Sequence, residues 1–285
     1  MKIAISGSNG YIGKNLILEL KKTDHEIIRI ERSKLYDIEQ LSGIISGTSV
    51  VINLAGSSIL RRWTEAAKIE ISRSRIDTTR NIVKAINSLP DEQRPAVFIS
   101  ASAVGIYAPN NIHTEESTSL SYDFLGEVVK TWERTSQQLT PAVRRVVFRI
   151  GVVLGKESKT IQKLLPITKI GLGGKIGNGK QPFPFVHIND AVKAIIWSIE
   201  NINAKGIYNL TAPENINNDT FTKTLAKALK RPAFFTIPAF ALKVIFGQAS
   251  VLLLESPQVV PERLLNEGFE FSFPDINSCI AEIAK

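Results

Sequence analysis

Three glycines near the start of the chain have the spacing of a phosphate-binding turn. Gly7, Gly10 and Gly13 form a G-x-x-G-x-x-G pattern directly after an apolar run at residues 3–6. Residues without a Cβ let backbone N–H groups approach a pyrophosphate closely, and the N-terminus of a following helix adds partial positive charge. A lone match is weak, but this one lies between a predicted strand and a predicted helix. The residues predicted to bind a dinucleotide are therefore Gly7, Ser8, Asn9, Gly10, Tyr11, Ile12 and Gly13.

The end of the second predicted strand carries two residues that bear on the choice of dinucleotide. Glu31 stands where a carboxylate accepts hydrogen bonds from the ribose hydroxyls of NAD. It would repel the 2′-phosphate of NADP by roughly 4 kcal/mol at contact, at an effective dielectric of about 20 and before screening by water. Arg32 follows directly and could pair with that phosphate, and an ordinary exposed ion pair is the alternative for both residues. We expect NAD(P) as the cofactor, with a slight preference for NAD.

Short apolar runs alternate with helical patterns over most of the first 210 residues. Near-continuous apolar strands that alternate with helices are typical of a parallel sheet covered on both faces. The pattern predicts an α/β fold with a Rossmann-type doubly wound parallel sheet. Strands are expected at 3–6, 27–31, 50–55, 96–101, 145–150 and 206–210, with helices near 10–22, 63–88, 123–139 and 188–200.

The pattern changes after residue 210, where little strand character remains. Helices are expected near 218–230, 238–254, 258–267 and 275–284, separated by prolines. This predicts a small, mainly helical C-terminal substrate lobe. The dinucleotide-binding domain is assigned to 1–165, completed by 183–211, and the lobe to 212–285 with the Gly/Pro-rich loop 166–182.

The composition limits which binding partners and which cellular compartment are expected for the chain. The single cysteine, Cys279, fits a reducing environment, and three histidines without ligand spacing argue against a metal site. No signal peptide is apparent at the N-terminus, and the apolar stretch 240–254 is too short and too polar to span a membrane, so we expect a cytoplasmic protein without a membrane partner. The net charge of +8 raises nucleic-acid binding, but no run of Lys or Arg exceeds two residues, so no nucleic-acid partner is expected. A small-molecule substrate is expected, and a homodimer is left open.

Several motifs together resemble one known family. The chain looks like the extended short-chain dehydrogenase/reductase family, and most closely like its atypical subgroup of epimerase family proteins, which are similar to sugar-nucleotide epimerases. The resemblance covers nearly the whole chain. It rests on ISGSNGYIG (5–13), VINLAG (51–56), RRWTEAAK (61–68), SRIDTT (74–79), ISASAVGIY (99–107), FRIGVVLG (148–155), GNGKQPFPFVHIND (177–190) and PERLLNEGFEF (261–271).

The resemblance implies roles for several residues. Ala55 and Gly56 would border the adenine half of the cofactor, and Ser100 would also contact the cofactor. Ser102 would occupy the position of the family's catalytic serine. Gln181 and His187 would lie near the substrate cleft. The alternatives are a strand end for Ala55 and Gly56, a turn cap for Ser102, a packing role for His187 and a helix cap for Asp190.

The chain departs from the family in its catalytic helix. The family uses a Tyr-x-x-x-Lys pair, in which the lysine lowers the pKa of the tyrosine. Here Lys130 follows Tyr122 by eight residues, about 12 Å along a helix, so the two are predicted not to touch. When the helix is aligned through the Trp132–Glu133 dipeptide, Leu125 and Val129 fall where the pair should be. The atypical subgroup is known for lacking the pair.

The remaining candidates for catalysis are Ser102, Tyr107 and Arg75. The resemblance places Arg75 where the family carries an asparagine of its proton relay. A permanently charged arginine is a poor proton shuttle, but it could lower the pKa of Tyr107 or bind a substrate phosphate or carboxylate. The leading hypothesis is an NAD(P)-binding oxidoreductase or epimerase that acts on a nucleotide-sugar-like or other anionic small molecule. The alternative, favoured by the missing pair, is a non-catalytic NAD(P)-binding redox sensor or scaffold.

Overall fold

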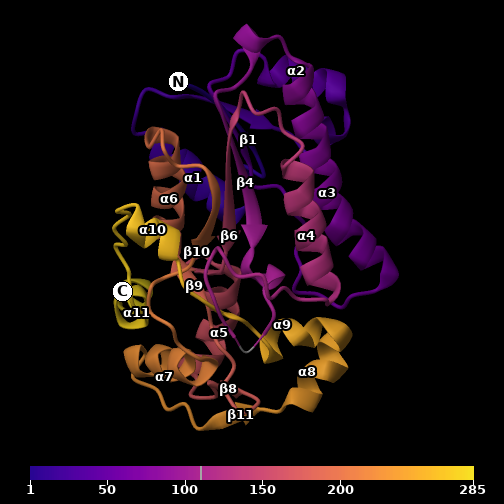
Figure 1. Cartoon of the computed structure of the whole chain (residues 1–285). Coiled ribbons are helices and arrows are strands. Elements are labelled where there is room, and N and C mark those ends of the chain that lie inside the picture. Colours follow the sequence, from indigo (N-terminus) through magenta and orange to yellow (C-terminus); the bar gives the residue numbers. More distant parts are fainter. Residues whose placement is uncertain (110) are drawn as a thin grey trace.

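The computed structural model describes residues 1–109 and 111–285 and is built around a parallel sheet of six strands (Figure 1). The strand order is β10-β6-β4-β3-β1-β2, with every pairing parallel. The six predicted strands and the Rossmann-type doubly wound class are thereby confirmed. The strands are β1 (Lys2–Ser6), β2 (Glu26–Ile30), β3 (Val50–Asn53), β4 (Val97–Ala103), β6 (Arg144–Ile150) and β10 (Gly206–Leu210).

Helices cover both faces of this sheet, which explains why its strands are apolar on consecutive residues. Side chains alternate between two cores: Ile3 and Ile5 pack in one, and Ala4 packs in the other. Helices α1 (Tyr11–Leu20) and α6 (Ile188–Glu200) close the first core. On the opposite face lie α2 (Ile38–Ile45), α3 (Glu65–Ser88) and α4 (Phe124–Ser136) (Figure 1).

The order in which successive strands are added to the sheet reverses at β1, although all strands stay parallel. From β1 the chain steps to β2 at one edge and then crosses back, so that β3, β4, β6 and β10 follow on the other side. In such sheets the loops after the two central strands diverge, and a crevice opens at their carboxyl ends. The crevice therefore lies beyond β1 and β3.

A buried chain of polar side chains fixes the ends of these two strands. Ser6 Oγ donates to Asn53 Oδ1 at 2.6 Å, and Asn53 Nδ2 donates to Thr79 Oγ1 at 2.8 Å. Trp132 Nε1 donates to the same hydroxyl at 2.8 Å. Because buried polar groups are costly without partners, these bonds hold β1 and β3 in register with α3 and α4.

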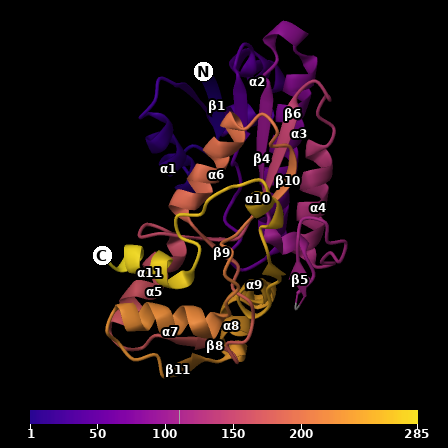
Figure 2. The ribbon, with the colours of Figure 1, turned by 60° about the vertical axis from the view of Figure 1, so that its left-hand side comes forward.

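The C-terminal part is mainly helical, as predicted, but it also contains short strands. Its helices are α5 (Lys159–Lys169), α7 (Asn218–Ala228), α8 (Ala239–Phe246), α9 (Val251–Leu254), α10 (Glu262–Asn266) and α11 (Ile276–Ala284). Three two-stranded ribbons join distant segments: β7 (Val152–Leu154) with β9 (Phe185–His187), β8 (Gly174–Ile176) with β11 (Phe235–Ile237), and β5 (Ile112–His113) with β12 (Gln258–Val259). Figure 2 shows α5, α7, β8, β11 and α8 below the sheet.

Several predicted boundaries are wrong for local reasons. The helix expected at 238–254 is interrupted at Gly247, whose φ of +58° ends α8. The loop expected from residue 166 starts only after Lys169, because α5 continues through Pro166. The segment at 258–267 begins as strand β12 before Pro261 precedes α10. Helix α2 was not predicted.

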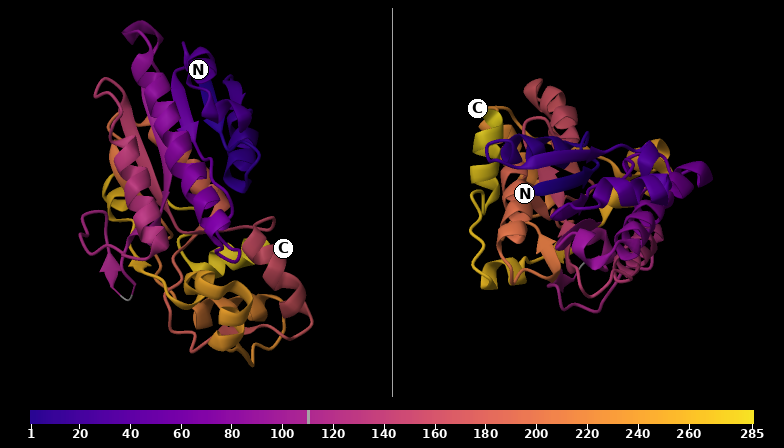
Figure 3. Two further views of the ribbon diagram at one scale, coloured as in Figure 1. Left: turned by 90° about the vertical axis from the view of Figure 1, so that its right-hand side faces the viewer. Right: turned by 90° about the horizontal axis from the view of Figure 1, so that it is seen from above.

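The chain after residue 257 returns to the sheet, where α10 packs beside β10, and the right panel of Figure 3 shows the yellow segment running alongside the orange elements. Leu264 and Phe269 are buried in the core beneath α6. Arg263 Nη1 donates to the carbonyl of Ile207 in β10 at 2.8 Å. The predicted boundary at residue 211 marks the end of the last sheet strand, but residues beyond it still pack on the sheet, so the domain assignment stays a prediction.

Within the described ranges, no helix has both the length and the apolar character needed to cross a membrane.

Candidate functional site

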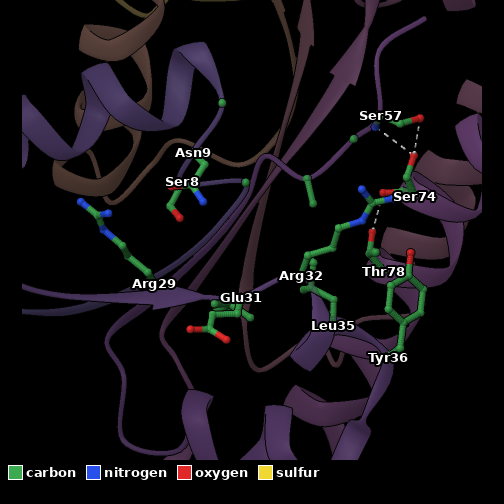
Figure 4. Close-up of a pocket in the computed structure, with 15 residues that line it drawn as sticks. Ser8, Asn9, Arg29, Glu31, Arg32, Leu35, Tyr36, Ser57, Ser74 and Thr78 are labelled. Atoms are coloured by element: carbon green, nitrogen blue, oxygen red, sulfur yellow. Dashed lines mark hydrogen bonds between the residues drawn. The ribbon is translucent and has the colours of Figure 1, made fainter.

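A cavity of about 440 Å³ opens at the carboxyl ends of β1, β2 and β3 (Figure 4). Its lining brings together eight of the residues predicted to bind the cofactor: Gly7, Ser8, Asn9, Gly10, Glu31, Arg32, Ala55 and Gly56. It also includes residues for which no role was predicted: Arg29, Ile30, Leu35, Tyr36, Ser57, Ser74 and Thr78. The cavity coincides with the crevice that the strand order creates.

The turn after β1 is shaped by close contacts between backbones. Gly7 has a φ of +71°, and a Cβ at this position would lie 2.5 Å from the carbonyl of Leu54. A Cβ on Gly13 would lie 2.4 Å from the carbonyl oxygen of Gly7, so the absence of a side chain at Gly13 lets α1 pack closely on the turn. These two glycines are required by packing.

Gly10 has a different role from its neighbours. It is the N-cap of α1, with an ordinary extended backbone (φ −74°), and it lines the cavity. As a glycine it has no side chain to cap the first turn, so the N–H groups there face the cavity without a side-chain acceptor. Such a helix start binds anions well, because the helix dipole adds to the hydrogen bonds.

Two of the turn residues point elsewhere. Tyr11 and Ile12 pack against the core beneath α1 and do not line the cavity. The Tyr11 hydroxyl lies beside Gly155, and burial raises the pKa of Tyr11 to about 12. Their side chains point towards the core, so a contact of Tyr11 and Ile12 with the cofactor would be made by their backbone N–H groups, and their predicted role stays a prediction.

The far wall of the cavity is rich in charge. Arg29, Glu31 and Arg32 all line it, together with Tyr36 from the short 3-10 helix at Ser33–Tyr36 (Figure 4). Arg29 and Glu31 are two residues apart on β2 and its extension, and therefore project to the same side. That alternation was the sequence feature that could have identified Arg29. The Arg32 guanidinium also lies 3.5 Å from a carboxylate oxygen of Glu70.

Arg75 lies directly behind the loop that follows β3. Its guanidinium donates to the carbonyl of Ser57 at 3.0 Å and to the carbonyl of Ile71 at 3.1 Å. A Cβ on Gly56 would lie 3.1 Å from the guanidinium carbon, so Gly56 allows this close contact. In the described part of the chain, every hydrogen-bond acceptor of Arg75 is neutral. Burial, and then the charge of Arg61, lowers the pKa of Arg75 to about 10, which leaves it protonated at neutral pH.

Ser102 and Tyr107 belong to a buried network on the other side of β4. Glu133 and Arg149 form a two-pronged ion pair, with N–O distances of 2.9 and 2.8 Å. Ser102 Oγ donates to the same Glu133 carboxylate at 2.5 Å. The Tyr107 hydroxyl accepts from Arg149 at 2.7 Å and is 2.7 Å from Asn209 Oδ1. The network joins α4, β4, β6 and β10.

This placement corrects the predicted role of Tyr107. Its side chain is only 1% exposed and does not line the cavity. Burial raises the pKa of Tyr107, although Arg149 opposes the shift, so the phenol is a poor base. Its cationic partner is Arg149 and not Arg75. Ser100 is also buried, with its hydroxyl bonded to the carbonyl of Ala101, and does not line the cavity.

Apolar side chains fill the positions of the family's tyrosine and lysine. Leu125 packs with Trp63, and Val129 packs with Tyr107. Tyr122 precedes α4 and is 88% exposed. The prediction that it cannot touch Lys130 is wrong: the Lys130 ammonium lies 4.3 Å from the Tyr122 ring centre, because Tyr122 is not helical.

The two predicted substrate residues, His187 and Gln181, form hydrogen bonds within the fold. His187 is 1% exposed: its Nε2 lies 3.1 Å from Glu282, and its Nδ1 accepts from the Asn189 N–H, which makes His187 the cap of α6. The cap predicted for Asp190 is therefore wrong, and Asp190 instead accepts from two backbone N–H groups at residues 272 and 273. The Gln181 amide donates to the carbonyls of Ile176 and Leu253.

No cluster of three or more His, Cys, Asp or Glu side chains that could hold a metal ion occurs among residues 1–109 and 111–285.

Comparison with known proteins places the chain among related sequences and folds. Residues 3–211 match the model of the NAD dependent epimerase/dehydratase family, and residues 237–283 match a domain family of unknown function, DUF1731. The chain is 34% identical to the human epimerase family protein SDR39U1 over 294 residues, covering 99% of each. It is 33% identical to the chloroplastic SDR39U1 homologue of Arabidopsis thaliana, covering 99% of the chain and 86% of the relative. The crystal structure of human SDR39U1 with NADPH superposes with a TM-score of 0.92 at 32% identity and covers 100% of this chain and 99% of the human one.

Gly10 provides a test of the cavity with a small expected effect on the fold. Gly10→Leu keeps an allowed backbone, its Cβ would lie 3.1 Å from the Gly7 carbonyl oxygen, and its branched side chain would stand where a pyrophosphate would meet the start of α1. We expect dinucleotide affinity to fall at least about a hundredfold, while the melting temperature changes by only a few degrees. Gly43→Leu is the matched control, because Gly43 is exposed and has open space around it. Unchanged affinity in Gly10→Leu, measured by nicotinamide fluorescence titration, would remove the phosphate site from this turn.

His187 predicts a particular pH dependence of stability. Burial lowers the pKa of His187, although Glu282 opposes the shift. The unfolded chain takes up this proton below about pH 6.5 and the folded chain resists it, so the stability from neutral His187 is present above that pH and is lost as the pH falls. His187→Asn keeps an acceptor for the Asn189 N–H but does not titrate. We expect the variant's melting temperature to fall less than that of the unmodified chain between about pH 7.5 and 5.5. The same change at His25 is the control, and parallel pH curves for His187→Asn and the unmodified chain would contradict the assignment.

Proposed function

The chain belongs to the NAD dependent epimerase/dehydratase family, and from this premise we propose that it is an NAD(P)-dependent oxidoreductase or epimerase acting on a nucleotide-sugar-like or other anionic small molecule. The observation that carries the proposal is the position of Arg75, whose guanidinium lies against the loop bordering the cofactor cavity with neutral acceptors only. In the described structure Arg75 forms no ion pair with a carboxylate, and the Glu70 carboxylate is paired with Arg32 and Arg61. Such a cation favours an anionic ligand at this place.

The cofactor would lie across the carboxyl ends of the strands. Its pyrophosphate would meet the backbone N–H groups at Gly10 and the start of α1, with its adenosine between Tyr36 and the loop at Gly56. The nicotinamide supplies hydride transfer when bound. The residues of this chain orient it and exclude water.

The charge around the adenosine ribose favours NADP(H). The slight preference for NAD rested on Glu31 against Arg32, but Arg29 lines the same cavity, so two arginines and one glutamate stand at this wall, with Arg32 also 3.5 Å from Glu70. A 2′-phosphate gains two charge-assisted partners there. The human relative was solved with NADPH, which supports the same preference. We therefore replace the weak preference for NAD with one for NADP(H).

Arg75 would bind the phosphate or carboxylate of the substrate beside the nicotinamide. Its carbonyl contacts hold the guanidinium in place, so little side-chain freedom is lost on binding. Arg61 also lies nearby, but it is paired with Glu70 at 2.8 Å, so Arg75 is the guanidinium of the two that has no carboxylate partner in the described structure.

Ser102 remains the candidate for proton transfer, in a form that the sequence did not predict. Its hydroxyl donates to Glu133, which leaves its oxygen free to accept a hydrogen bond from a substrate hydroxyl; a proton taken from that hydroxyl would require Ser102 to pass its own proton to Glu133. The Arg149 partner keeps the Glu133 carboxylate fixed. Ser102 is only 4% exposed, so this role requires substrate or cofactor to approach the end of β4 closely.

One observation favours a second function, a non-catalytic dinucleotide sensor or scaffold. Leu125 and Val129 fill the positions of the usual acid–base pair and are buried. A protein that only senses the cofactor needs the cavity and not the pair. The two functions differ in one measurable property, because only an enzyme exchanges hydride between its bound nicotinamide and a second molecule.

The ribose-facing charges predict the cofactor preference. We expect NADPH to bind about tenfold more tightly than NADH. Replacing both arginines, as in Arg29→Gln with Arg32→Gln, should abolish the difference by weakening NADPH alone. Arg73→Gln, on the exposed side of α3, is the control. Tighter binding of NADH to the unmodified chain, in the same titrations, would restore Glu31 as the deciding residue.

Arg75 predicts the class of substrate. With NADP⁺ bound, Arg75→Gln should weaken binding of UDP-glucuronate, used as an anionic probe, by at least about tenfold, and Arg75→Lys should weaken it less. Arg80→Gln, on the same helix in an exposed pair with Asp77, is the control. Calorimetry gives the affinities, and nicotinamide fluorescence on addition of a panel of nucleotide sugars and carboxylates reports hydride exchange. Equal probe binding by Arg75→Gln and Arg80→Gln would contradict the anion site, and binding without hydride exchange across the panel would favour the sensor.

A further inference from the structure

The positive charge of the chain is concentrated in one part of it. Residues 159–184 contain five lysines and no acidic residue, and residues 218–254 contain five Lys or Arg residues and one acid, Asp219. These two segments, named here the basic end, therefore carry a net charge of +9, against +8 for the whole chain. The rest of the molecule is close to neutral. No run of Lys or Arg in the sequence exceeds two residues, but the fold brings the two basic segments together.

The same segments expose large apolar side chains. Phe234 is 88% exposed, Phe240 71%, and Ile170 and Val244 70% each. Single exposed apolar residues are ordinary, whereas a group of them on one face marks a surface that contacts another apolar phase or partner. None of the four lines the cofactor cavity.

The fold brings these residues to one end of the molecule. Strand β8 pairs with β11, which places the segment around Ile170 beside Phe234, and a Cβ on Gly171 would lie 3.7 Å from Pro232. Helix α8 follows β11 directly and carries Phe240 and Val244 four residues apart, on one face. Figures 1 and 2 show α7, β8, β11 and α8 together at the end of the molecule farthest from α2.

We propose that the basic end docks on the surface of an anionic phospholipid bilayer, with Phe234, Phe240 and their apolar neighbours entering the interface and the surrounding lysines contacting lipid phosphates. A bilayer surface is the partner that uses both features, because basic residues are attracted to anionic headgroups and Phe, Leu and Ile side chains bury at the boundary with the acyl chains. Two copies of this chain cannot pair through it readily, because two surfaces of charge +9 repel. A nucleic acid would use the charge but leave the aliphatic side chains without a partner.

The earlier expectation of no membrane partner rested on the absence of a spanning segment, and surface docking does not need one. The four exposed apolar residues that would enter the bilayer do not line the cofactor cavity. The proposal is therefore independent of the proposed chemistry.

Vesicle flotation of the intact chain tests the proposal. We expect the chain to bind vesicles in which about a third of the phosphatidylcholine is replaced by phosphatidylglycerol, and to bind pure phosphatidylcholine at least about tenfold more weakly. Phe234→Ser with Phe240→Ser should reduce binding to the anionic vesicles at least about tenfold. Lys169→Gln with Lys243→Gln should reduce it similarly, and added salt should mimic that loss.

Matched control variants distinguish docking through the basic end from non-specific adsorption to vesicles. Ile202 is 81% exposed outside the basic end, so Ile202→Ser should leave vesicle binding unchanged, as should Lys21→Gln with Lys84→Gln. Unchanged dinucleotide affinity in every variant shows that each has folded. No binding to anionic vesicles overturns the proposal. An equal loss of vesicle binding in the control variants also overturns it. So does a result in which the variants change only the oligomeric state measured by sedimentation, or in which the chain binds a single-stranded RNA and the Phe234→Ser, Phe240→Ser variant binds that RNA equally well.

Discussion

Three backbone segments meet at the carboxyl end of β1 at distances that leave no room for a Cβ. The carbonyl of Leu54 lies against Gly7, and the carbonyl of Gly7 lies against Gly13. Because these contacts bring the loop after β3 and the first turn of α1 together, the start of α1 opens into the crevice beside the β3 loop. The cavity, its anion-binding helix start and the placement of Gly56 all follow from that constraint. The polar chain from Ser6 to Trp132 holds the same segments from beneath.

Apolar side chains stand at the positions of the family's acid–base pair, and the buried charges lie elsewhere. A buried Glu133–Arg149 pair fixes Ser102 and Tyr107, and Leu125 and Val129 close the space around α4 with apolar packing. Removing one partner of such a pair leaves a buried charge, which costs several kcal/mol, so the network acts mainly on the architecture. Arg75 does not itself line the cavity; its guanidinium lies against the loop at Gly56 and Ser57 that borders it, without a charged partner in the described structure. This division explains how the fold can bind a dinucleotide with unusual chemistry, or with none.

Local sequence patterns predicted most of the fold, because each depends on neighbours in the chain. The six strands, the main helices, the phosphate turn and the placement of Glu31 and Arg32 at one wall depend on alternation and glycine spacing. Predictions failed where the partner is remote: Tyr107 meets Asn209, His187 meets Glu282, and Gln181 meets Leu253. The contact of Tyr122 with Lys130 was missed for a local reason, because the helix starts two residues later than the tyrosine. The resemblance singled out Ser102 and Arg75, but only the fold shows which groups each of them contacts.

The central claim is that a dinucleotide binds across β1 and β3 with Arg75 beside its reactive end. A crystal structure of the chain grown with NADP⁺ tests it most directly. The account predicts the pyrophosphate within hydrogen-bonding distance of the N–H groups at the start of α1, the 2′-phosphate between Arg29 and Arg32, and the nicotinamide directed towards Arg75 and Ser102. A dinucleotide bound elsewhere, or one whose 2′-phosphate faces solvent while its nicotinamide lies over Tyr122, would contradict it.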